Sequence, residues 1–203
     1  LDAKIKEIFA EFDPKDIDSL IKTGKKTREL ILNAEFPKDL KAKIIKSYKK
    51  LSRKYGEQYT DVAVRSSATA EDLATASFAG QMETYLNIKG EEELLRAAKK
   101  CIASLFTDRS ISYREQKGFN HLKIALSVCV QKMVRSDKAS SGIMFTLDTE
   151  TGFENVVLIN SIWGIGEMIV QGKITPDEFF VFKPTLEKGF KSIIVKNLGR
   201  KNL

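Results

Sequence analysis

The hydrophobic pattern changes along the chain from helical spacing near the start to consecutive strand-like runs near the end. In KDLKAKIIKSYKKLSRKYG, apolar residues recur every three or four positions, Pro37 suits a first helical turn and Gly56 can close the helix. From Ile124 onwards, KIALSVCVQKMV, SSGIMFTLD, NVVLINSIW, EFFVFK and SIIVKN are β-branched and aromatic runs between turn signals. Helices followed by consecutive strands predict an α+β fold with a mainly antiparallel sheet, and not alternating βαβ units.

The character of the sequence changes near Asp61, which predicts a division of the chain. Residues 1–60 read as a helical N-terminal segment without a recognisable motif, and the strand-rich remainder forms the second part, 61–203. The helical segment holds 15 of the 34 Lys and Arg residues and 10 of the 27 Asp and Glu residues, so most of the net charge of +7 lies there. Because acids alternate with these bases, a solvated helix surface explains the charge better than a nucleic-acid partner does.

Composition also limits the class of protein. With 203 residues, 42% of them hydrophobic, the chain can bury a sizeable core, and its apolar runs are too short to span a membrane. It begins at Leu1 and not at Met, so we expect that the natural N-terminus is missing. Cys101 and Cys129 lack CxxC spacing and histidine neighbours. Both are predicted to be small core residues, in neither a disulfide nor a metal site, which suits a reducing cytoplasm.

The residues best suited to phosphate lie in VAVRSSATAEDLATASFAGQMETYLNI. A strand delivers Arg65 beside Ser66 and further small polar residues, and a guanidinium offers a planar fork of donors to phosphate oxygens. A second loop offers Gly80 for close backbone approach and Thr84 as a hydroxyl donor. The same residues could also form an ordinary serine-rich turn, with Arg65 in a salt bridge and Gly80 as a turn residue. Neither loop matches the Walker pattern.

Four motifs in one order resemble the nucleotide-binding domain shared by phosphoenolpyruvate synthases and pyruvate phosphate dikinases. They are RSSATAEDLATASFAGQMETYLN, SLFTDRSISYR, QKMVRSDKASSGIMFTLDTETGF and WGIGEMIVQGKITPDEF, and the resemblance is closest to the synthases. It implies an ATP-grasp-like fold, in which two subdomains clamp the nucleotide. Residues 61–203 are therefore expected to form an incomplete ATP-grasp-like nucleotide-binding domain, as a fragment of a longer multidomain protein.

On the phosphate side, the resemblance implies roles for three residues. The arginine of the family's VRSSA motif contacts the ATP phosphates, which makes Arg65 the expected catalytic residue. The glycine and threonine of the FAGQxxT loop, which lies over the phosphates, correspond to Gly80 and Thr84.

On the adenine side, the resemblance places the glutamine of the QxMV strand, here Gln131, beside the base. Met133 and Val134 are expected to line the same pocket. The glutamate of the GxGE motif, here Glu167, is expected to face the nucleotide. Glu167 is equally explained as the first-turn acid of a short helix.

The resemblance further implies that the full enzyme converts ATP, pyruvate and water to AMP, phosphoenolpyruvate and phosphate. The phosphoryl group would pass through a histidine carrier domain to a barrel domain of the same chain, and a homo-oligomer is compatible with this scheme. His121 lacks the surroundings of that carrier and is expected to be structural. No metal ligand is expected here, since the Mg²⁺ ligands of the family lie outside this fragment, and neither nucleic acid nor membrane is an expected partner. A pyruvate phosphate dikinase, a rifampin phosphotransferase-like enzyme and a non-catalytic basic binding module stay open as alternatives.

Overall fold

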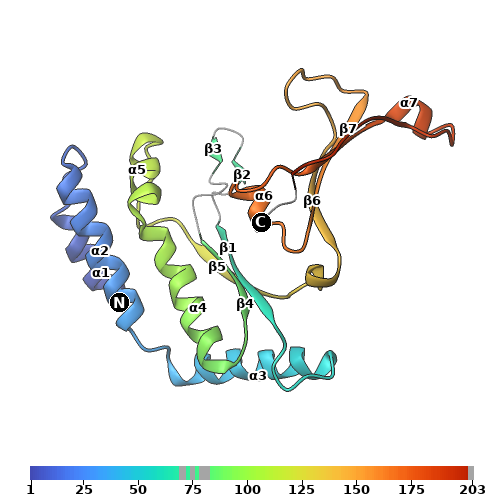
Figure 1. The fold of residues 1–203 in the computed structure, drawn as a ribbon. Helices are drawn as coiled ribbons and strands as arrows, with labels where there is room; N and C mark the ends of the chain where they lie inside the picture. Colours follow the sequence, from blue (N-terminus) through green and yellow to red (C-terminus); the bar gives the residue numbers. More distant parts are fainter. Residues whose placement is uncertain (69–71, 74–75, 78–82, 201–203) are drawn as a thin grey trace. The chain divides into compact units, whose positions relative to one another are not determined.

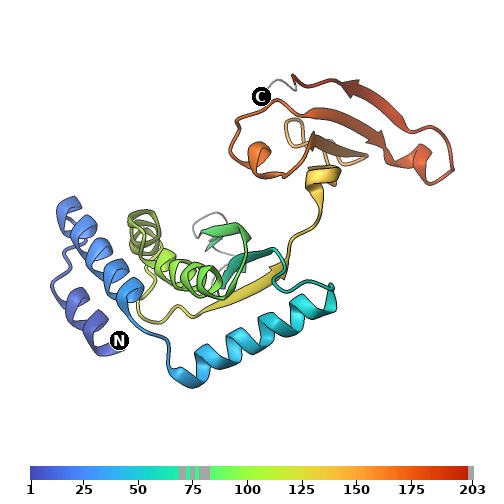
Figure 2. The ribbon, with the colours of Figure 1, turned by 60° about the horizontal axis from the view of Figure 1, so that its bottom comes forward.

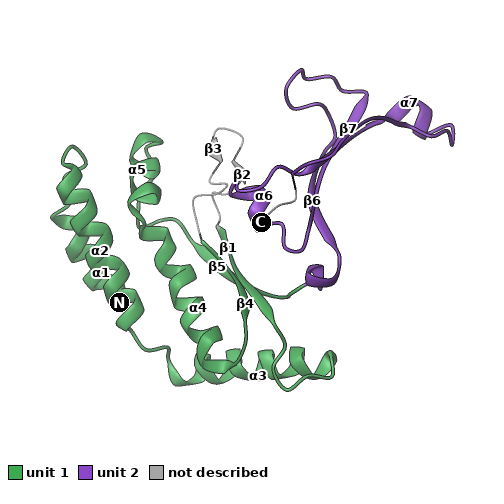
Figure 3. Ribbon diagram, in the orientation of Figure 1, with its two compact units in different colours: residues 1–133 green, residues 134–203 purple. Residues whose placement is uncertain are grey.

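The computed structural model describes residues 1–68, 72–73, 76–77 and 83–200. The chain forms two compact units, residues 1–133 and residues 134–203 (Figure 3). The boundary expected near residue 60 lies inside the first unit, because the N-terminal helices pack there with the first sheet and its helices.

Three helices precede the first strand, in agreement with the helical N-terminal segment predicted from the sequence. Asp16 caps the second of them by accepting a hydrogen bond from the backbone N–H of Asp18. Pro37 is the N-cap of the third, and Gly56 follows its end with a φ of 70°. Two further helices, joined by a 3-10 turn, follow after residue 90. The helices of the first unit are α1 (Asp2–Ala10), α2 (Ile17–Asn33), α3 (Lys38–Lys54), α4 (Glu91–Ala103), η1 (Ser104–Phe106) and α5 (Asp108–Gln116).

The first unit contains an antiparallel sheet with one face covered by helices (Figures 1 and 2). Tyr48 of α3 and Leu94 of α4 pack in one cluster with Val62 and Val64, which are fully buried. A second cluster joins α1, α2, η1 and α5 around Ile111. The sheet has the order β4-β1-β5, and a short hairpin lies apart from it. The strands are β1 (Val62–Ala68), β4 (Thr84–Ile88) and β5 (Leu126–Lys132), and the hairpin pairs β2 (Asp72–Leu73) with β3 (Ala76–Ser77).

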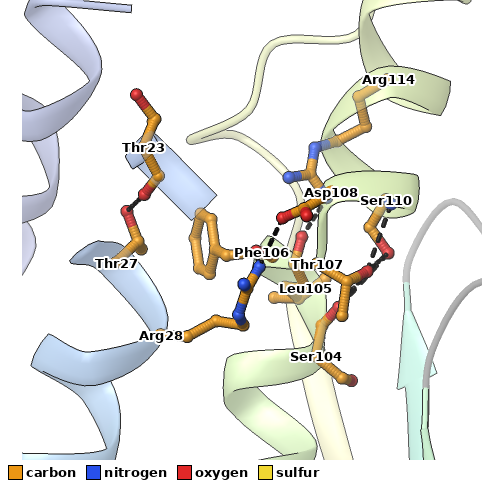
Figure 4. A network of polar contacts seen from close by, with 10 residues as sticks. All are labelled: Thr23, Thr27, Arg28, Ser104, Leu105, Phe106, Thr107, Asp108, Ser110 and Arg114. Atoms are coloured by element: carbon orange, nitrogen blue, oxygen red, sulfur yellow. Dashed lines mark hydrogen bonds and ion pairs between the residues drawn. The ribbon is translucent and has the colours of Figure 1, made fainter. Parts of the chain in front are cut away.

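The SLFTDRSISYR motif folds into a buried polar corner between α2, η1 and α5 (Figure 4). Arg114 is 1% exposed, and its Nη1 donates to the Leu105 carbonyl at 2.5 Å. Its guanidinium also lies over the Phe106 ring, 5.6 Å from the centroid. Arg28 of α2 donates to the Phe106 carbonyl at 2.6 Å and pairs with Asp108 at 2.8 Å. This motif therefore ties the helices together, and burial lowers the pKa of Arg114 to about 10.

The second unit is built on a four-stranded antiparallel sheet, in agreement with the runs read from the sequence. Gly142 lies so close to the neighbouring strand that an added Cβ would stand 2.1 Å from the Asn160 carbonyl oxygen. Only glycine fits that approach. The sheet has the order β6-β7-β8-β9, and short helices accompany it. Its elements are η2 (Ser136–Lys138), β6 (Ser140–Phe145), β7 (Val156–Trp163), α6 (Glu167–Val170), β8 (Asp177–Phe182), α7 (Lys183–Leu186) and β9 (Ile193–Asn197).

Together, the helices and the antiparallel strand pairs confirm the predicted α+β class. Within the described ranges, no helix combines the length and the apolar character needed to cross a bilayer.

Candidate nucleotide-binding face

The alternation along β1 separates a helix-covered face of the sheet from an exposed one. Val62 and Val64 point into the core formed with α3 and α4. Since successive strand residues point to opposite faces, Arg65 lies on the other face, where it is exposed. Ser66 returns to the helix side, and its side chain hydrogen-bonds the Cys101 thiol of α4.

The strand register brings four residues together on the exposed face. We call them the exposed row: Arg65, Thr84, Cys129 and Gln131. Arg65 lies directly opposite Thr84 of β4 and opposite Cys129 of β5. Residues opposite one another in antiparallel strands share a face, with Cβ atoms about 4.5–5.5 Å apart. Gln131 lies opposite Ala63, and therefore on the same face, two positions along β5 from Cys129. The side chains of Arg65, Thr84, Cys129 and Gln131 are all exposed, so this face presents a cation, a hydroxyl and an amide to solvent.

Arg65 forms no ion pair with any residue in the described ranges. Arg28, in contrast, pairs with Asp108 at 2.8 Å, and Lys49 pairs with Glu91 at 2.7 Å. The salt-bridge explanation of Arg65 therefore finds no partner among the described residues. A guanidinium that has no ion pair with the described residues and lies beside a hydroxyl is suited to bind an anion with several oxygens, such as phosphate.

The two cysteines differ from the common role predicted for them. Cys101 is fully buried, as predicted, and burial raises the pKa of its thiol to about 11, although the Ser66 hydrogen bond opposes the shift. The prediction for Cys129 is wrong, because this residue is exposed. Val128 and Val130 take the helix-side positions of β5, so alternation turns Cys129 to the other face.

The remaining predicted site residues are not part of this row. Met133 ends the first unit, half-buried, and its N–H donates to the Asp61 carbonyl at 2.9 Å. Val134, 79% exposed, begins the second unit. Glu167 is the first residue of α6 and accepts a hydrogen bond from Gln171 Nε2 at 2.8 Å. Gly80 lies outside the described residues.

His121 takes part in packing with the N-terminal helix. Its ring centroid lies 5.0 Å from that of Phe9 and 5.5 Å from that of Phe12. Arg114 Nε donates to Nδ1 at 3.0 Å, and Nε2 lies 2.5 Å from Glu115 Oε1. Because Nδ1 accepts a hydrogen bond, the ring is neutral with its proton on Nε2.

Comparison with known proteins gives the face its context. The whole chain, residues 1–203, matches the family described as pyruvate phosphate dikinase, AMP/ATP-binding domain. It is 58% identical over 198 residues to the phosphoenolpyruvate synthase of Helicobacter pylori, covering 98% of this chain and 24% of that protein. The Aquifex aeolicus phosphoenolpyruvate synthase is 58% identical over 199 residues, which cover 98% of this chain and 23% of that protein. That of Escherichia coli is 48% identical over 200 residues, with 98% and 25% covered.

These matches and the α+β fold define the class of the protein as a nucleotide-binding domain. More particularly, the chain belongs to the pyruvate phosphate dikinase AMP/ATP-binding domain family. It spans about a quarter of the length of the curated relatives it matches.

Proposed function

We propose that this chain is the ATP-binding part of a phosphoenolpyruvate synthase. In the full enzyme, ATP, pyruvate and water would yield AMP, phosphoenolpyruvate and phosphate through a phosphohistidine on another domain. The observation that carries the proposal is the exposed row on the first sheet, where Arg65 lies opposite Thr84 without an ion-pair partner among the described residues. The family match and the names of the relatives support the same function.

In this proposal, Arg65 binds the phosphates and stabilises the charge that develops on the transferring phosphoryl group. Thr84 donates a hydrogen bond to a phosphate oxygen from the neighbouring strand, and Gly80 lets the loop approach the phosphates. Such catalysis consists of positioning and electrostatic stabilisation, not covalent chemistry by these side chains. Formation of AMP requires that the bond between the α and β phosphates breaks. The bond between the β and γ phosphates also breaks, so that one phosphoryl group ends on pyruvate and the other on water, as inorganic phosphate.

The base of ATP is proposed to lie beside Gln131, with Met133 and Val134 as apolar lining. Gln131 shares the exposed face with Arg65, which supports its role. Glu167 is proposed to face the nucleotide. Ser66 can contribute through its backbone only, because its side chain lies toward Cys101 on the helix side.

Within the described ranges, no three His, Cys, Asp or Glu side chains gather. Mg²⁺ at a nucleotide is held by one or two carboxylates together with phosphate oxygens and waters. We propose that segments outside this chain supply the magnesium ligands, and that pyruvate, the histidine carrier and the barrel domain are also met there. A cytoplasmic location agrees with the two free cysteines.

Product analysis of the full-length protein tests this function. With ATP and pyruvate, we expect AMP, phosphoenolpyruvate and phosphate in equal amounts, measured by ion chromatography, and no turnover from the isolated domain. A requirement for phosphate with release of pyrophosphate would instead identify a pyruvate phosphate dikinase. AMP formation that needs a different acceptor, such as rifampin, would also overturn the proposal, and so would the absence of any ATP cleavage.

A further inference from the structure

Strand β4 contains one residue more than the part of β1 that it faces. Val64 lies opposite Tyr85 and Val62 lies opposite Ile88, so one residue of β1 faces two residues of β4. Asn87 lies in this bulge with a φ of 56°, and no other non-glycine residue in the described ranges has a positive φ. This left-handed conformation is unfavourable for residues with a Cβ, and asparagine tolerates it better than most.

The bulge allows two apolar residues of β4 to point to the helix-covered face of the sheet. Tyr85 and Ile88 both pack against the cluster under α3 and α4. They are three positions apart, and a regular strand would point them to opposite faces. One extra residue restores both to the helix side. Burial there raises the pKa of Tyr85 to about 12.

The same bulge decides which way Thr84 points. If β4 kept the pairing at Ile88 but lacked the extra residue, every residue of β4 before Ile88 would shift by one position and change faces. Thr84 would then lie opposite Ser66 and turn toward the helices, while Tyr85 would lie opposite Arg65. The exposed row would lose its hydroxyl and gain an aromatic ring.

We propose that Asn87 is a positioning residue for nucleotide binding, whose left-handed conformation holds the bulge that presents Thr84 beside Arg65. Bulges commonly re-aim a side chain next to a functional site. Asn87 acts through Thr84 and does not itself contact the nucleotide. The inference rests on the proposed function, because it requires that ATP contacts the exposed row.

Three variants of the full-length protein test the role of Asn87 by steady-state kinetics with ATP and by thermal melting. Asn87→Gly keeps the left-handed conformation accessible, so kcat/KM for ATP should stay within about twofold of the original. Asn87→Val strongly disfavours it, and kcat/KM should fall at least about tenfold, as expected for loss of a hydrogen bond to a charged group. Asn87→Ala should fall between the two, and it replaces Asn87→Val if the valine variant does not fold.

A double variant separates positioning through Thr84 from a general loss of structure. Thr84→Val should lower kcat/KM by a similar factor, and Asn87→Val combined with Thr84→Val should be no worse than the more impaired single variant. Gly56→Val places the same strain at a φ of 70° after α3, so it should lower the melting temperature without changing kcat/KM for ATP.

Two results would lead to different conclusions. If Thr84→Val impairs ATP use while Asn87→Val changes only the melting temperature, the positioning role is wrong and the proposed function stands. If neither Arg65→Ala nor Thr84→Val alters ATP use, the exposed row does not bind the nucleotide, and the proposed function fails together with the inference.

Discussion

Replacement of Arg65 by alanine in the full-length protein should remove catalysis far more than stability. The Arg65 side chain is exposed and has no ion-pair partner among the described residues, so its loss should change the free energy of unfolding by about 0.5 kcal/mol or less. If the guanidinium stabilises the transferring phosphoryl group, its loss should raise the activation free energy by about 3–5 kcal/mol. That corresponds to a rate loss of roughly a hundredfold to several thousandfold.

The assay combines steady-state kinetics with thermal melting for the original protein, Arg65→Ala and Arg65→Lys. Lysine keeps the charge but lacks the planar fork, so it should recover only a small part of the rate. Arg28→Ala is the matched control, because Arg28 pairs with Asp108 at 2.8 Å in the buried polar corner and is not part of the exposed row. It should lower the melting temperature and leave turnover of the folded enzyme unchanged. Near-original turnover with a lowered melting temperature in Arg65→Ala would refute the phosphate role.

Two further predictions concern the buried polar corner between α2, η1 and α5. Arg114→Ala should destabilise the fold by about 3 kcal/mol or more in urea denaturation, because it opens a cavity and leaves the buried Leu105 carbonyl without its donor; a loss no greater than that of Arg28→Ala would contradict this. Burial lowers the pKa of His121 below 6.5; the Arg114 charge acts in the same direction and Glu115 opposes it. Below about pH 6.5, the unfolded chain therefore takes up a proton that the folded chain does not. Stability should therefore fall as the pH drops from 7 toward 5, and His121→Gln should lose that part of the pH dependence; an unchanged slope in this variant would exclude His121 as its source.

Local patterns predicted the helices and strands well, because each element carries its own periodicity. Pro37 and Gly56 bracket α3 as the sequence indicated, and every strand-like run after residue 124 became a strand. The face of a strand was harder to predict. KIALSVCVQKMV is apolar over most of its length, so only the pairing of β5 with β1 shows that Cys129 is exposed.

Other features depend on contacts between distant segments and left weak signals in the sequence. Arg114 stands among polar letters typical of a solvated helix, yet packing against η1 buries it. The bulge at Asn87 had one signal, since Tyr85 and Ile88 are apolar at a spacing that a regular strand cannot bury on one face. Only the register of β4 against β1 shows that Arg65 lies beside Thr84. The resemblance indicated these two residues in two separate motifs and did not pair them.

Alkylation of Cys129 in the presence and absence of ATP tests most directly whether the nucleotide covers the exposed row. Cys129 lies opposite Arg65 and is exposed, whereas Cys101 is fully buried with a pKa of about 11, so only about one in a thousand Cys101 thiols is ionised at pH 8. Cys101 is thus an internal control in the same protein, read by peptide mass spectrometry after N-ethylmaleimide treatment. With ATP at ten times its Kd, we predict that alkylation of Cys129 slows about tenfold. An unchanged rate at Cys129 under conditions where the full-length protein turns over ATP would contradict the account.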